Sequence, residues 1–304
     1  MQRYSHSGIV PTTGAIQTLL AGVGFATVGG AIYAFAAYWL AGWGPIRFLL
    51  MLGYSLVVGV AVAVAANSGK IRSPLFNSAV ALLSVAVGLW IYWGAYDVAR
   101  NGLAVAPSAW TPAGLTRNAS DMFVNGSFTM KRKQKVDGWL LVAFWIGEGV
   151  CVTGIAIALA RSDANVPFCE NCQEWTKSEQ ALLRLAASGA EREWQEVLAG
   201  DLPALAVFER AYTKTTPQVR LDLARCPKCE HSNFVSLTAV TITKDKKGND
   251  KTKERSLIVN GAITDPEAVF LAEFAKQMTG MNEIDEDDDE EEEHGETGTG
   301  ADAT

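Results

Sequence analysis

Four of the five cysteines in this 304-residue chain stand in two short pairs, Cys169 with Cys172 and Cys226 with Cys229. Two residues between paired thiols let one tight turn present both sulfurs to a single ion. Four deprotonated sulfurs close a tetrahedron around Zn²⁺ and leave no coordination position open, which is typical of a structural site rather than a catalytic one. The spacing therefore predicts one zinc ion held by these four cysteines.

The second pair lies in the sequence Cys226-Pro227-Lys228-Cys229 and precedes two β-prone stretches, 234–243 and 255–263, with a charged turn between them. A cysteine knuckle followed by a hairpin resembles the zinc-ribbon family, and the resemblance covers residues 166–172 and 223–263. It implies a structural zinc ion within an α+β domain. The two pairs are separated by 53 residues, whereas about 15–20 residues separate such pairs in most ribbons.

The long spacer predicts a helical insertion at 176–215. Residues 176–187 combine a capping box with helix-forming side chains, and further helices are expected at 191–199 and at about 201–212. Lengthening the loop in this way costs only about 1 kcal/mol of closure entropy. Structural zinc sites contribute on the order of 10 kcal/mol, so the domain tolerates the insertion.

A last helix is expected to begin at Asp265 and to end before Gly280. The segment after it, 282–304, contains 12 Asp and Glu residues and no Lys or Arg, which predicts a disordered acidic tail. Nucleic acid is an unlikely partner for the ribbon, because this tail competes for the lysines of the predicted hairpin. Only Phe234 lies near those lysines as an aromatic stacking residue.

Four stretches of the N-terminal half are apolar enough to cross a membrane, which takes about 20 residues in a helix. They cover about 15–40, 46–66, 77–97 and 138–160. The expected architecture is a membrane α-helical bundle of four transmembrane helices at 1–161. An α+β zinc-ribbon-like soluble domain with its helical insertion follows at 162–281.

Glu148 is the charged residue deepest within a predicted span. An ionisable group there costs a few kcal/mol, so it is either functional or a hydrogen-bonded contact between helices. The sequence shows no basic partner within the spans, and we expect a hydrogen-bonded carboxyl with Ser55 or Ser84 as its partner. The alternative is a transporter or channel subunit with Glu148 in its permeation or coupling path.

The first span is dense in glycine and alanine, which let helix backbones approach closely. Packing within the bundle is the favoured interpretation, and a homo-oligomer formed through this span is the alternative. Cys151, the fifth cysteine, lies within the last span and is expected to be a small buried packing residue. Aromatic residues near the span ends, Tyr96 among them, are expected to form an interfacial belt.

Two features of the sequence favour opposite orientations in the membrane. Four spans put both termini on one side, and the basic residues near the spans, including the run 131–135, favour the side opposite the cytosol for the termini. Zinc-binding thiolates, however, require a reducing compartment. We give the thiolates more weight and expect a cytosolic C-terminal domain.

The sequence shows no constellation of catalytic residues. We therefore expect a non-enzymatic integral membrane protein whose zinc-binding domain acts as a scaffold that recruits a protein partner. A membrane thiol oxidoreductase is a further alternative, although two cysteine pairs followed by a hairpin favour zinc over redox chemistry. His231, two residues after Cys229, is expected not to bind the metal because four cysteines already complete the site.

Overall fold

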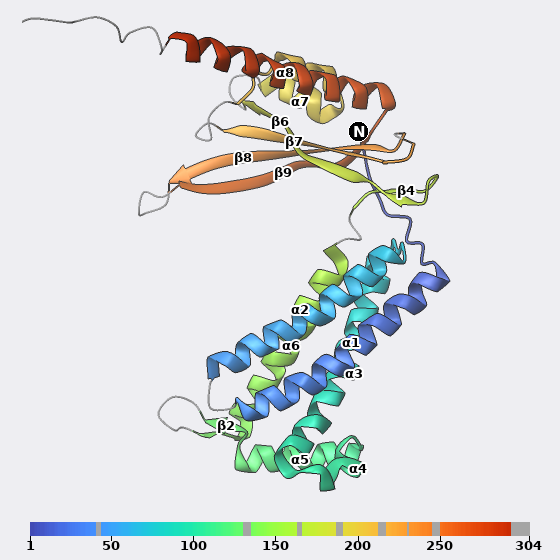
Figure 1. Ribbon diagram of the computed structural model, residues 1–304, viewed down its shortest axis with the longest axis vertical. Coiled ribbons are helices and arrows are strands. Elements are labelled where there is room, and N and C mark those ends of the chain that lie inside the picture. The colour runs from blue at the N-terminus through green and yellow to red at the C-terminus, as the bar shows by residue number, and fades with distance from the viewer. Residues whose placement is uncertain are drawn as a thin grey trace, which may run out of the picture. The chain divides into compact units, whose positions relative to one another are not determined.

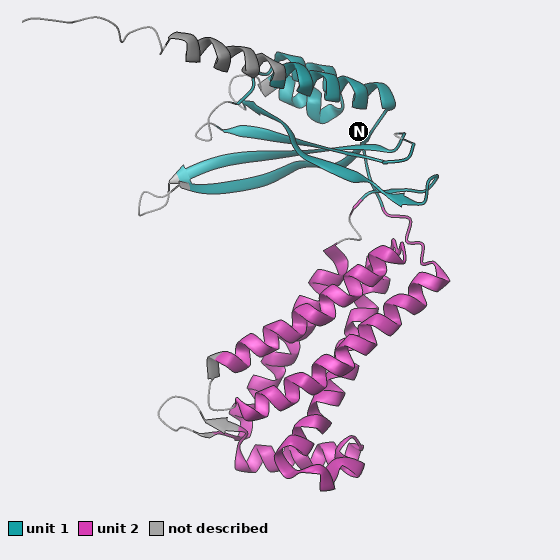
Figure 2. Ribbon diagram, in the orientation of Figure 1, with its two compact units in different colours: residues 1–5, 167–304 teal, residues 6–166 magenta. Residues whose placement is uncertain are grey.

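The computed structural model describes the backbone of residues 1–292 apart from 41–43, 130–134, 163–165, 187–190, 212–216, 230 and 245–249. The chain forms two compact units (Figure 2). One contains residues 6–166. The other contains residues 1–5 together with everything from residue 167 onward, so the first five residues belong to the C-terminal unit.

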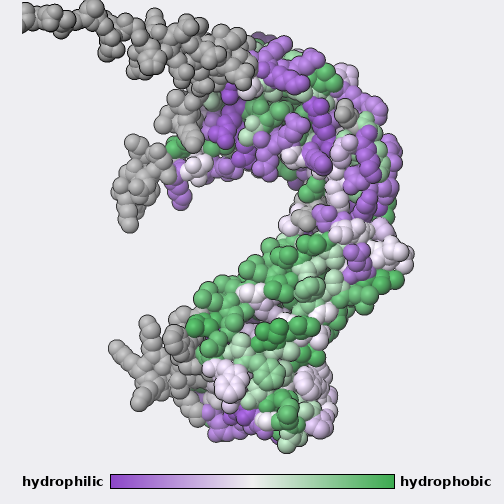
Figure 3. All heavy atoms as spheres, viewed as in Figure 1, coloured by the Kyte–Doolittle hydropathy of each residue, from purple (hydrophilic) through white to green (hydrophobic). Residues whose placement is uncertain are grey.

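Four long helices form the N-terminal unit: α1 (Thr12–Trp39), α2 (Gly44–Ser68), α3 (Pro74–Asn101) and α6 (Gly138–Ser162). Helices α1 and α6 each pack against both α2 and α3. All four are long and apolar enough to cross a membrane. The outward-facing side chains of the bundle are largely hydrophobic (Figure 3), as the apolar stretches predict.

The connection from α3 to α6 is structured over most of its length. It contains the short helices η1 (Leu103–Val105) and α4 (Ala106–Ala109), the longer α5 (Pro112–Asn125), and the paired strands β2 (Phe128–Thr129) and β3 (Lys135–Val136). Thr111 caps α5 by accepting a hydrogen bond from the Gly114 N–H. The basic run 131–135 lies almost entirely outside the described residues.

Small residues at four-residue spacing on α1 face the interior of the bundle. They are Gly14, Thr18, Gly22, Ala26, Gly30 and Ala34, and all are buried. A Cβ atom on Gly30 would lie 2.5 Å from the backbone oxygen of Gly88 in α3. The small side chains therefore serve contacts within the chain, which is the interpretation favoured from the sequence. The exposed Gly24 lies off this stripe.

A five-stranded antiparallel sheet forms the centre of the C-terminal unit, in the order β1-β9-β8-β7-β6. Its strands are β1 (Gln2–Arg3), β6 (Lys177–Ala186), β7 (Gln218–Arg225), β8 (Asn233–Lys244) and β9 (Asp250–Ile263). A separate two-stranded hairpin, β4 (Phe168–Cys169) with β5 (Glu174–Trp175), precedes β6.

Helices cover one face of this sheet (Figure 1): α7 (Glu191–Ala199), the 3₁₀ helix η4 (Leu202–Val207) and α8 (Asp265–Glu292). Alternate residues of β7, namely Val219, Leu221 and Leu223, point into the core beneath them. The β8–β9 hairpin after the second cysteine pair is the one that the sequence predicts, and α7 lies at the predicted position.

The prediction of a helix within 176–187 is wrong, because residues 177–186 form strand β6. A capping-box match depends only on a few neighbouring residues. The strand is favoured by the core, because the alternation Leu183-Arg184-Leu185 buries both leucines and leaves Arg184 exposed. Strand β7, which the sequence analysis also missed, pairs with β6 along its length. The spacer therefore completes the sheet and is only partly a helical insertion.

Helix α8 begins at Asp265 as expected, but its capping residue is Thr264. The Thr264 N–H and hydroxyl both donate to the carboxylate of Glu267, at 2.7 and 2.8 Å. The helix continues past Gly280 to Glu292, and thus into the segment predicted as an acidic tail. Side chains from residue 280 onward and the backbone from 293 onward lie outside the described residues.

The close contact of α1 with α3 leads to a direct test. Gly30→Ala should destabilise the bundle by about 1–3 kcal/mol, because the added methyl collides with a backbone oxygen that cannot move alone. Gly24→Ala is the matched control, since nothing lies within 4 Å of the added atom and alanine is the better helix former. Thermal unfolding in detergent measures both, and equal midpoints would contradict the packing.

Candidate functional site

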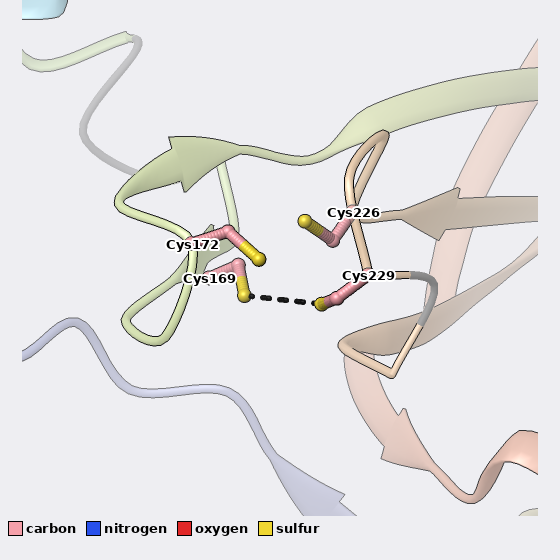
Figure 4. A group of neighbouring side chains, drawn as sticks. All are labelled: Cys169, Cys172, Cys226 and Cys229. Carbon is pink, nitrogen blue, oxygen red and sulfur yellow. Dashed lines mark hydrogen bonds between the residues drawn. The ribbon is translucent and has the colours of Figure 1, made fainter.

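The four paired cysteines come together in the C-terminal unit (Figure 4). Their sulfur atoms all lie within 4.8 Å of one another, and the Sγ atoms of Cys169 and Cys229 are 3.7 Å apart. All four are free thiols. Cys169 and Cys226 are buried, whereas Cys172 and Cys229 are half-buried, so the cluster lies just beneath the surface.

Two turns position these thiols. Cys169 ends β4 and Cys172 follows in the turn to β5, a hairpin further closed by the Thr176 N–H, which donates to the Pro167 carbonyl at 3.0 Å. Cys226 directly follows β7, and its N–H donates to the Ser232 carbonyl at 3.1 Å. The cluster therefore joins the small β4–β5 hairpin to the turn between β7 and β8, two neighbouring strands of the sheet.

The geometry suits a tetrahedral metal. Bonds of about 2.3 Å from a central ion to four sulfurs place neighbouring sulfurs roughly 3.8 Å apart, close to the observed 3.7 Å. Four thiolates leave no position for water or substrate, so an ion bound here would stabilise the fold instead of performing catalysis. The donor set thus fits a metal ion.

The electrostatics of the cluster favour one thiolate, that of Cys169, over a second at Cys172. Burial raises the pKa of the Cys169 thiol, but hydrogen bonds from Ser232, the Cys172 backbone and the neighbouring thiols outweigh it and lower this pKa to about 6. The hydrogen bond with Cys229 contributes most to raising the pKa of Cys172 to about 12. One thiol therefore ionises first, and a metal ion must displace the remaining protons.

Lys228 brings a positive charge to the second knuckle. Its Nζ lies 2.9 Å from Glu174 on β5. The hydrogen bond and charge of Glu174 raise the pKa of Lys228, and the charges of Cys172 and Cys226 add to this effect. An ammonium group beside a tetrathiolate partly compensates the excess negative charge of the site.

Two other residues that could take part in metal binding or thiol chemistry, His231 and Cys151, lie outside this cluster. His231 contacts Asp265 at the start of α8, with Nδ1 2.6 Å from Oδ2, and is not part of the four-thiol group. Cys151 is exposed on α6, so the prediction that it is a buried packing residue is wrong. Its side chain faces away from the bundle because α6 buries only one face.

Glu148 lies inside the bundle of four helices, but its partners are not the serines predicted. Its carboxylate accepts a hydrogen bond from the Tyr33 hydroxyl of α1 and lies 3.7 Å from Arg47 of α2. Arg47 also donates to the Tyr92 hydroxyl of α3 at 3.2 Å. Ser55 bonds the Met51 carbonyl of its own helix instead. The Glu148 carboxylate thus connects α6 with the other three helices.

Stacked tyrosine rings surround this carboxylate. The Tyr33 ring lies 4.7 Å from that of Tyr92 and 5.7 Å from that of Tyr54, centre to centre, and Tyr92 contacts Tyr96 at 5.9 Å. Tyr96 is therefore an interior residue and not part of an interfacial belt. The prediction that Glu148 has no basic partner within the spans is wrong, because Arg47 at the start of the second predicted span lies beside it. The tyrosine cluster was not predicted, although four tyrosines within three apolar helices indicate a polar interior.

Comparisons with known proteins add no relative: no family model, no curated protein and no solved structure matches this chain.

The cysteine cluster predicts one bound metal ion per chain. Cys226→Ser in the full-length protein should release the ion, because serine does not supply a thiolate, and should expose the C-terminal unit to protease. Cys151→Ser is the matched control, since Cys151 lies outside the cluster. Elemental analysis of the purified protein measures the metal content. A metal-free wild-type protein whose protease resistance is unaffected by chelators would contradict the site.

Proposed function

We propose that this chain is an integral membrane protein whose zinc-stabilised domain recruits a protein partner at the membrane surface. The single observation that carries the proposal is the closed four-thiol cluster. It has no open coordination position, so its metal would hold a binding surface in shape and would not act on a substrate. A tetrahedral four-thiolate set suits zinc or iron, and we choose zinc because its structural sites commonly use two paired-cysteine knuckles.

The apolar exterior of the four long helices supports membrane insertion. Side chains such as Leu20, Phe25 and Ile32 on α1 and Ile146 and Val150 on α6 are exposed. An apolar surface of this extent is stable in lipid and unfavourable in water. The bundle would then cross the bilayer four times.

The soluble unit offers the first part of an edge strand as a recruiting surface, whereas the last part of that strand, 184–186, already bonds to residues 209–211. Strand β6 is the last strand of the sheet, and its first four residues, 177–180, are exposed. An extended peptide can add a strand to such an edge through main-chain hydrogen bonds. The cysteine cluster lies close by along the chain, since a single residue separates the end of β5 from the start of β6.

Recruitment is tested with the intact protein in its own membrane. A partner that depends on the folded zinc domain should co-purify with wild-type protein and with Cys151→Ser, and should be lost from Cys226→Ser. Quantitative mass spectrometry of the three samples measures this. The proposal fails if the same proteins are recovered at equal levels with all three, or if metal loss changes thiol oxidation without changing any partner.

Cytosolic placement of the zinc domain is part of the same proposal. Strand β1 at the extreme N-terminus pairs with β9, so both ends of the four-helix region lead to the same unit and belong on one side of the membrane. An even number of crossings satisfies this requirement. Thiolate ligands favour the reducing side.

Membrane-impermeant thiol reagents and protease distinguish the two orientations. With intact cells, neither should reach the C-terminal unit if it is cytosolic, whereas both should reach it after the membrane is permeabilised. The measurement is mass spectrometry of labelled and cleaved peptides. Cleavage of the C-terminal unit in intact cells, with protection of the segment between α3 and α6, would reverse the orientation.

A further inference from the structure

Buried polar side chains are arranged in a line through the interior of the four-helix bundle. Asn77, Ser84 and Tyr92 lie on the inner face of α3, Thr18 on α1 and Tyr54 on α2. The α3 positions are separated by seven and eight residues, which is two helical turns each, so they share one face. Thr18 and Tyr54 belong to the two helices that pack with α3 around the same interior.

Three atoms in this line have no hydrogen-bond partner among the described residues: Asn77 Oδ1, Ser84 Oγ and the Tyr54 hydroxyl. Their residues are 1 %, 0 % and 4 % exposed. Buried polar atoms without partners are costly, and more so in apolar surroundings. Thr18, Ser55 and Ser78 avoid that cost because each hydroxyl donates to a carbonyl four residues earlier on its own helix. The Ser84 hydroxyl makes no such bond.

The two unpartnered hydroxyls lie directly against glycines of the neighbouring helices. A Cβ on Gly22 of α1 would lie 2.5 Å from Ser84 Oγ, and one on Gly88 of α3 would collide with the Tyr54 hydroxyl. Ser84 and Gly88 are one turn apart, so the two hydroxyls are separated by about 6 Å along the helix axis. One water molecule that bonds both would span that gap.

The line ends at the Glu148 carboxylate. Tyr54 stacks on Tyr33 with their rings 14° from parallel, and Tyr33 donates to Glu148. The groups that face Glu148 are Tyr33 from α1, Arg47 from α2 and, through Arg47, Tyr92 from α3. The Glu148 side chain is 16 % exposed and that of Arg47 is 12 % exposed, so this end of the line is less enclosed than Ser84.

We propose that these residues form a proton pathway through the bundle. Internal water completes a hydrogen-bonded chain from Asn77 past Ser84 and Tyr54 to Tyr33 and Glu148. A proton from water at one end binds to the first internal water, which donates a hydrogen bond to Asn77 Oδ1, while each water or hydroxyl along the chain passes on its own proton. The Glu148 carboxylate receives the last proton and releases it to water on the other side. No bond other than O–H bonds forms or breaks, and no group is oxidised or reduced.

Free hydroxyls are what such a pathway requires. A hydroxyl that relays protons must accept a hydrogen bond on one side and donate on the other, and must rotate between transfers. Ser84 and Tyr54 satisfy this because neither is bound to the backbone of its own helix. The inference does not depend on the zinc domain or on partner recruitment.

Proton flux in vesicles tests the pathway. The full-length protein is reconstituted into liposomes that contain a pH-sensitive dye, and a potassium gradient with valinomycin drives protons inward. Wild-type vesicles should acidify faster than protein-free vesicles. Ser84→Ala and Tyr54→Phe should each slow the flux about tenfold, because each removes one hydrogen-bonding hydroxyl. Glu148→Gln should abolish it, since an amide does not accept the proton.

Ser55→Ala is the matched control, because Ser55 is equally buried but its hydroxyl is bound to its own helix. It should conduct like the wild type. Thermal unfolding in detergent checks that the variants are folded, and Tyr54→Phe, which keeps the ring, decides the matter if Ser84→Ala is unstable. Wild-type flux no faster than that of protein-free vesicles overturns the proposal. So does equal flux in Ser84→Ala and Ser55→Ala, or osmotic water permeation without proton flux.

Discussion

The close approach of α1 to α3 is the contact on which the bundle depends. In a bilayer, helices have no hydrophobic reason to associate, so the backbones would have to come close enough for van der Waals contact to stabilise the pair. A small residue at every turn of α1, with Gly88 opposite Gly30, permits that approach. The same proximity encloses Ser84 and Tyr54 between helices, where both side chains are buried.

The ion pair of Arg47 and Glu148 holds helices together by charge and not by close packing. It stabilises the bundle only while both charges are present, because removing either leaves the other buried and uncompensated. The two charged groups are 3.7 Å apart, and Arg47 also donates a hydrogen bond to Tyr92, so the ion pair is loose and belongs to a larger network. Gly147 and Gly149 beside Glu148 have no neighbour within 4 Å of an added Cβ, and α6 buries few of its residues. Of the four helices, α6 is therefore held most by polar contacts and least by packing.

In the C-terminal unit a metal ion would take the place of a larger core. The β4–β5 hairpin has only two residues in each strand, too little to be stable alone. Four thiolates would attach it to the β7–β8 turn, and Phe168 adds packing against Trp175 at 4.9 Å. The Tyr4 hydroxyl accepts a hydrogen bond from the Phe168 N–H, so the N-terminal segment, the hairpin and the sheet converge near the cysteines.

The sequence by itself determined the features that depend on composition and short spacing. The four apolar helices, the cysteine pairs, the β8–β9 hairpin, α7 and the start of α8 could all be predicted, because each is specified by neighbouring residues. The alternation Val219-Arg220-Leu221-Asp222-Leu223 also predicts a strand, and it was overlooked. Only the tertiary structure decided that 177–186 is a strand, since helix-forming residues there gain more from pairing with β7 than from a local helix. The partners of Glu148 were likewise decided by packing, because Tyr33, Arg47 and Glu148 lie on three helices and no sequence spacing relates them.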